Sequence, residues 1–240
     1  MSTKHSKAAE AFLKNAELAR WHNETLWMVR QKRDRIGKAI PEWEDLRDMA
    51  CALKLYSNSH LAELLETFER NATANGAIVH WAKDAEEYCE IVYDILQSHH
   101  VKHFIKSKSM LAEECGLNDY LISRGIDTVE SDLGERILQL MHKKPSHIVL
   151  PAIHIRKEEI GELFVREMGT EPGNNDQTYL THAARKNLRH KFLEAEAAMT
   201  GANFAVASTG ECVVCTNEGN ADMGTSQPKL QITAFGLEKI

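Results

Sequence analysis

Hydrophobic residues recur with helical spacing in the first third of the chain. Two sets fall at i, i+3, i+4 and i+7, namely Leu46, Met49, Ala50 and Leu53, and then Leu61, Leu64, Leu65 and Phe68. This spacing is typical of amphipathic helices and predicts that both stripes are packing faces. We therefore expect a helical N-terminal region over residues 1–74, with a break near Gly37 and Pro41.

Large apolar side chains in the first long helix allow two interpretations. Trp21, Trp27 and Met28 lie among charged residues. A large aromatic residue on a helix usually belongs to the core, so we favour burial. Contact with a partner is the alternative.

From Asn75 onward the pattern alternates between strand and helix. Short apolar runs predict strands at residues 77–81, 102–105, 126–129, 148–150 and 230–234. Helical patterns begin at Asp84 and Ser109, the second running to about Tyr120, and cover residues 135–142, 157–168 and about 180–199. Such alternation predicts an α/β domain over residues 75–240, with a mostly parallel sheet and flanking helices.

The segment 200–220, TGANFAVASTGECVVCTNEGN, carries two polar loops that contain glycine. Residues 203–207 and 211–214 suit strands, and Ser208-Thr209-Gly210 between them suits a tight hairpin turn. The second loop, residues 216–220, contains Asn217, Glu218, Gly219 and Asn220. We expect it at the end of a buried strand, where open α/β folds place ligands. Two ordinary turns are the plainer interpretation.

A lysine-rich loop lies between a predicted strand and a predicted helix. Lys106, Ser107, Lys108 and Ser109 would surround a helix N-terminus, which already favours an anion. A solvated turn explains the same residues, and no G-x4-G-K-[ST] phosphate loop is present. We predict a phosphate or carboxylate ligand between this loop and the Thr209-Gly210 turn.

Three acidic residues are candidates for a pocket. Asp132 follows a predicted strand and can cap the next helix or line the site. Glu113 lies in the first turns of a helix, where its negative charge can simply stabilise the positive end of the helix dipole. Glu218 is the candidate general base or nucleophile, a role that needs a pKa raised by burial.

Cysteine and histidine patterns do not predict a metal site. Cys212 and Cys215 match C-x-x-C, but residues three apart on a strand point to opposite faces. The cluster of His99, His100 and His103 lacks a second set of ligands at fixed spacing. His154 is best explained as a hydrogen-bonded histidine at a strand end.

Composition excludes several classes of protein. The 240 residues carry 35 acidic and 29 basic side chains, so no basic excess points to a nucleic-acid partner. No apolar run approaches the ~18 residues of a membrane span, and the N-terminus lacks a signal-like apolar segment. We expect a cytoplasmic protein whose five cysteines are reduced.

Five motifs together carry a family resemblance: KSKSM at 106–110, ESDLGE at 130–135, SHIVLPAIH at 146–154, TGANFAVASTG at 200–210 and TNEGN at 216–220. In this order they resemble the lactate-utilisation (LUD) domain family, most closely the N-terminal domain of the iron–sulfur members of L-lactate utilisation systems. The resemblance implies a fold similar to sugar isomerases and coenzyme A transferases. It also adds Gly201 and Asn203 to the expected ligand-binding residues and places Glu113 near the pocket.

In those iron–sulfur proteins, a ferredoxin-like region with cysteine runs follows the LUD domain and holds the clusters. This sequence stops at Ile240 without such runs. We therefore expect no cofactor within it, with iron–sulfur clusters only in a missing C-terminal region. The isolated chain should bind no cluster and should not oxidise L-lactate, since it also lacks a G-x-G-x-x-G fingerprint.

Three functional hypotheses follow from the motifs. The first is the LUD domain of an L-lactate oxidation complex, an electron-transfer partner that binds a small anion and sister subunits. The second is an autonomous acyl or coenzyme A transferase that uses Glu218. The third is a non-catalytic module whose helical N-terminus docks partner subunits.

Overall fold

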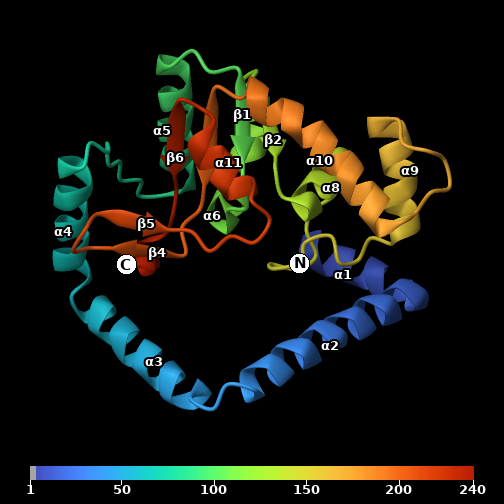
Figure 1. The fold of residues 1–240 in the computed structure, drawn as a ribbon, viewed down its shortest axis with the longest axis horizontal. Helices are drawn as coiled ribbons and strands as arrows, with labels where there is room; N and C mark the ends of the chain where they lie inside the picture. Colours follow the sequence, from blue (N-terminus) through green and yellow to red (C-terminus); the bar gives the residue numbers. More distant parts are fainter. Residues whose placement is uncertain (1–3) are drawn as a thin grey trace.

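The computed structural model describes residues 4–240, with side chains from Ser6 onward. Four helices come first: α1 (Lys4–Lys14), α2 (Ala16–Lys38), α3 (Trp43–Ser59) and α4 (Leu61–Ala74). Figure 1 shows α2 and α3 as an open arm that leaves the body and returns to it at α4. The helical N-terminal region is confirmed over residues 4–74, and residues 1–3 lie outside the described part.

Four parallel strands form the central sheet, in the order β2-β1-β3-β6. They are β1 (His103–Lys106), β2 (Asp127–Glu130), β3 (Ala197–Thr200) and β6 (Leu230–Thr233). The register pairs Lys106 with Glu130 and Thr200 with Thr233, so the last residues of neighbouring strands lie side by side. The predicted α/β class with a parallel sheet is confirmed.

Helices cover both faces of the sheet (Figure 1). On one face α5 (Ala85–Ser98), α6 (Met110–Glu114) and α7 (Leu117–Ile122) bury Leu96, Leu117 and Leu121 against Phe104 and Met199. On the other face lie α10 (Gln177–Glu194) and α11 (Asn220–Ser226). Beyond β2, α8 (Leu133–Met141) and α9 (Lys157–Met168) form a further cluster with α10. The last described element is the 3-10 helix η1 (Leu237–Lys239).

A two-stranded hairpin, β4 (Phe204–Val206) and β5 (Glu211–Val213), confirms the hairpin predicted at residues 203–214. It packs on α4, where Phe68 and Ala72 share an apolar cluster with Ala205 and Ile240. The hairpin turn lies directly against α4. A side chain at Gly210, whose φ is +74°, would meet the backbone nitrogen of Ala72 at 2.2 Å, so this position requires glycine.

Four predicted elements differ in the structure. Residues 77–81 and 148–150 form no strand, and Ile78 and Ile148 are exposed. The helix expected through about residue 199 ends at Glu194, and β3 follows it. The helix expected from Ser109 to about Tyr120 is divided into α6 and α7 at Gly116, which has a φ of +71°.

The expected burial of two apolar surfaces is also wrong. Trp21, Trp27 and Met28 are exposed on α2. The stripe beginning at Leu46 belongs to α3, which has no buried residue at all. The second stripe, on α4, does pack as predicted. None of the described helices is long and apolar enough to cross a membrane.

Candidate functional site

The carboxyl ends of the strands converge where the sheet changes direction. From β1 the chain adds β2 on one side and then returns to add β3 on the other. Loops diverge at such a switch point and leave a crevice, which is where open α/β sheets bind ligands. The loop 107–109 after β1 and the loop after β3 meet there, since a side chain at Gly201 would contact the Lys108 carbonyl at 3.3 Å.

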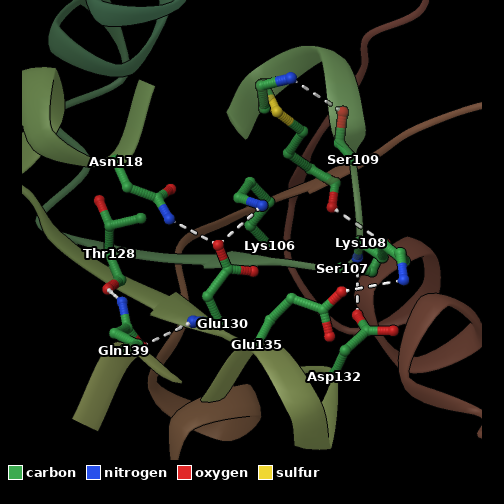
Figure 2. A network of polar contacts seen from close by, with 12 residues as sticks. Lys106, Ser107, Lys108, Ser109, Asn118, Thr128, Glu130, Asp132, Glu135 and Gln139 are labelled. Atoms are coloured by element: carbon green, nitrogen blue, oxygen red, sulfur yellow. Dashed lines mark hydrogen bonds and ion pairs between the residues drawn. The ribbon is translucent and has the colours of Figure 1, made fainter. Parts of the chain in front are cut away.

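A buried ion pair lies at this edge. Lys106 Nζ is 2.8 Å from Glu130 Oε1, and the two side chains are 2% and 6% exposed. Asn118 Nδ2 donates to the same oxygen at 2.5 Å, as Figure 2 shows. Glu130 Oε2 is buried without a hydrogen-bond partner. The parallel register brings the two side chains together, because Lys106 is the last residue of β1 and lies opposite Glu130, the last residue of β2.

Lys108 forms a second, more open set of contacts beside the first (Figure 2). Its backbone N–H donates to Asp132 Oδ2 at 2.6 Å. Its ammonium donates to the Val149 carbonyl at 2.8 Å and lies 3.2 Å from Glu135 Oε1. The Lys108 side chain is 30% exposed, so it is the lysine of the loop that reaches solvent.

Clustered carboxylates shift the pKa values at this edge. Burial, with the nearby Glu135, raises the pKa of Asp132 to about 6, and the charges of Glu218 and Glu130 act in the same direction. Burial also raises the pKa of Glu113, although Lys106 opposes that shift. Asp132 can therefore gain or release a proton near neutral pH.

The serines of the loop have structural partners. Ser109 caps α6 by accepting a hydrogen bond from the Ala112 N–H at 3.3 Å. The Ser107 N–H donates to the Met199 carbonyl at 2.9 Å and so extends the β1–β3 pairing beyond Lys106. Both serines are buried, and they fix the path of the loop that carries Lys108.

The hairpin turn does not join this site, contrary to the expected anion position between the two loops. Asn75 Nδ2 donates to the Thr209 carbonyl at 2.8 Å, and Gly210 lies against Ala72. The turn is thus held on α4. Asn203 is likewise engaged in the hairpin, because its Oδ1 accepts from the Cys215 N–H at 2.8 Å.

The loop 216–220 reaches the site by a different route from the one predicted. It follows β5, an exposed hairpin strand, rather than a buried strand of the sheet. Gly219, with a φ of +78°, turns the chain into α11, and Asn220 Nδ2 donates to Ser131 Oγ at 3.3 Å. Asn217 and Glu218 are exposed. Glu218 therefore lacks the burial that a general base would need, and its carboxylate acts on Asp132 instead.

Sequence reasoning missed four residues of the site: Asn118, Glu130, Ser131 and Glu135. For Glu130 a signal existed. Two neighbouring buried strands here end in residues of opposite charge. In a parallel register such residues are expected to lie side by side and form an ion pair. Asn118 gave no such signal, because its role depends on the break between α6 and α7.

The five cysteines lie on different parts of the fold. All five are free, and among the described side chains no group of three or more His, Cys, Asp or Glu residues is placed to hold a metal ion. Cys89 is buried in the core, whereas Cys51 is exposed on α3. His154 accepts or donates a hydrogen bond at 2.7 Å with Ser146, and burial lowers its pKa.

A family model and curated relatives both match most of the chain. The model of the LUD domain family matches residues 65–240. Relatives called "Lactate utilization protein B" are 40% identical over 202 residues in Bacillus thuringiensis (strain Al Hakam) and 41% over 202 residues in Bacillus cytotoxicus. Each match covers 84% of this chain and 42% of the relative. The relative from Bacillus pumilus is 39% identical over 211 residues, 88% of this chain and 44% of its own. The chain thus spans less than half the length of these curated relatives, and no solved structure matches it.

Proposed function

The chain belongs to the LUD domain family, and from this membership we propose that it acts in lactate utilisation, as one domain of a complex that oxidises L-lactate to pyruvate. The single observation that supports this most is the similarity to Lactate utilization protein B over 84% of the chain. Its role in the complex is that of a partner in electron transfer, shared with sister subunits. In this proposal the electron-accepting group belongs to another part of the complex.

The proposed contribution of this domain is the cluster of polar side chains at the switch point, with Lys108 as the contact for a small anion. Lys106 is unsuited to that role because it is buried and paired with Glu130. Among the described residues, the Lys108 ammonium contacts only the Val149 carbonyl and Glu135, at the exposed side of the cluster. A carboxylate ligand can take the place of the Val149 carbonyl at the ammonium, since a charged acceptor makes the stronger hydrogen bond.

Asp132 is the group proposed to hold a proton beside this anion contact. It accepts from the Lys108 N–H, so it is fixed beside the anion contact. With a pKa of about 6 it can accept a proton near neutral pH, as a general base in this position must. The alternative transferase that uses Glu218 has less support, because Glu218 is exposed on its loop.

Growth on L-lactate tests this proposal. The strain is a Bacillus cereus strain that lacks Lactate utilization protein B. It receives a gene for a chimera of that protein in which this chain replaces the matched segment. We expect the chimera to restore growth, and Lys108→Ala or Asp132→Asn to abolish it. Glu86→Lys, at an exposed position on α5, is the matched control and should grow normally.

Two outcomes would contradict the proposal. Equal rescue by the site variants would leave the domain a docking module, the alternative that the exposed arm favours. Lactate turnover by the purified 240-residue chain would show that the domain is a complete enzyme.

A further inference from the structure

The arm formed by α2 and α3 leaves a continuous apolar surface uncovered. Leu46, Met49, Leu53 and Tyr56 are each at least 50% exposed on α3. They are spaced by three, four and three residues, the a/d spacing of two helices that pack lengthwise. A helix of 17 residues with no buried side chain lacks the tertiary packing from which helices in proteins draw most of their stability.

The arm is held at its two ends and stands free between them. Arg156 contacts Glu17 at 2.6 Å near the start of α2. Lys54 Nζ donates to the carbonyls of Glu238 and Ile240, at 2.9 and 2.7 Å, near the end of α3. Figure 1 shows the corner between the two helices as the point farthest from the sheet.

The corner itself is built to keep its angle. Gly37 is buried because the indole of Trp43 lies over it, and a Cβ there would stand 3.3 Å from the ring. The Ile40 N–H donates to the Gly37 carbonyl at 3.2 Å. The two helices therefore diverge from a fixed turn and do not cover each other.

Charge divides the arm at this corner. Residues 30–38 of α2 carry five basic side chains and one acidic one, whereas residues 42–48 carry four acidic and one basic. Some of these charges are satisfied locally, as in the Arg33–Asp34 and Arg47–Glu44 pairs. Lys32 and Arg35 on one side, and Asp45 and Asp48 on the other, make no ion pair among the described residues.

We propose that the arm is a homodimer interface, in which α3 of each copy lies antiparallel along the second half of α2 of the other. A two-fold axis at the corner brings the basic end of α2 onto the acidic start of α3 in the second copy, and the reverse, as an isologous interface requires. The stripe on α3 then covers Met28 and Ile36, which are 62% and 54% exposed.

The size of the surface suits this occupant. α3 is 17 residues long, about 25 Å of helix, and the second half of α2 adds a second exposed helix on the other side of the corner. A second copy explains why opposite charges lie next to each other on the same chain, because each charged segment then faces its opposite. A different partner would not require this arrangement. The interface does not depend on the proposed function.

Sedimentation equilibrium of the full 240-residue chain tests the interface. The parent should be a dimer at micromolar concentration. Met49→Glu with Leu53→Glu should weaken dimerisation at least about tenfold while circular dichroism and thermal unfolding stay unchanged, because both side chains are already exposed. Glu86→Lys with Glu90→Lys, at exposed positions on α5, is the control and should remain dimeric.

A charge exchange gives the sharper result. Lys32→Glu with Arg35→Glu should weaken the dimer at least about tenfold, and adding Asp45→Arg with Asp48→Arg should restore it. A monomeric parent, a dimer insensitive to the arm variants, or failure of the exchange to restore it would each overturn the proposal. A chain that stays monomeric and binds a different lactate-utilisation protein through the arm would overturn it as well.

Discussion

Replacing Lys106 by methionine tests whether the pair at the strand ends is as buried as the geometry indicates. Methionine keeps the apolar stem and removes the ammonium 2.8 Å from Glu130 Oε1. Removing one partner of a buried pair costs about 3–5 kcal/mol, because the other charge is left without compensation. Asn118 Nδ2 stays as a donor to that oxygen, so the lower half of this range is the expected loss.

Urea unfolding followed by circular dichroism measures the loss. Lys106→Met with Glu130→Gln removes both charges and should lose no more than about 1–2 kcal/mol. A single variant that loses under about 1 kcal/mol at pH 7, or a double variant that loses as much as the single one, would contradict a buried ion pair.

Three further results are expected from the same assays and from nuclear magnetic resonance. Asp132→Asn should stabilise the fold by up to about 3 kcal/mol at pH 8, because a folded pKa of about 6 penalises the charged form. The gain should vanish below pH ~4, and a gain that persists there would contradict it. Gly210→Ala should destabilise by at least about 3 kcal/mol through collision with Ala72, whereas Gly173→Ala, also at positive φ but with nothing within 4 Å, should lose only about 1 kcal/mol, and equal losses would argue against docking of the turn on α4. Glu218→Gln should lower the pKa of Asp132 in a carbon-13 titration, and an unchanged pKa would show that the two are not neighbours.

Periodic segments of the fold were predictable from the sequence, and segments defined by tertiary contacts were not. The helix over residues 157–168 was expected with the bounds that α9 has. The strand β3 was missed because Ala197, Ala198 and Met199 are good helix formers that continue the pattern of α10. Only its position at the centre of the sheet, where all three are fully buried, makes this run a strand.

False strands arose from the opposite cause. Ile148 and Val149 favour strands by their branched side chains, yet they pair with no strand of residues 4–240. Their loop instead brings the Val149 carbonyl to Lys108. For the site, sequence placed Lys108 and Asp132 correctly at a strand end, but the partner of Lys106 followed from the register of two strands. The role of the hairpin turn was missed because its partner, α4, lies more than a hundred residues away.

The packing of α4 on the hairpin and on Ile240 has a consequence for synthesis. Phe68 and Ala72 emerge from the ribosome early, and the residues that cover them, Ala205 and Ile240, emerge long afterwards. At about 5–20 residues per second, the apolar face of α4 waits roughly ten seconds or longer for its cover. During that interval the nascent chain exposes an apolar helix face to chaperones and to neighbouring chains on the same messenger RNA. The amount of active protein in a cell is therefore sensitive to the speed of translation between residues 75 and 240.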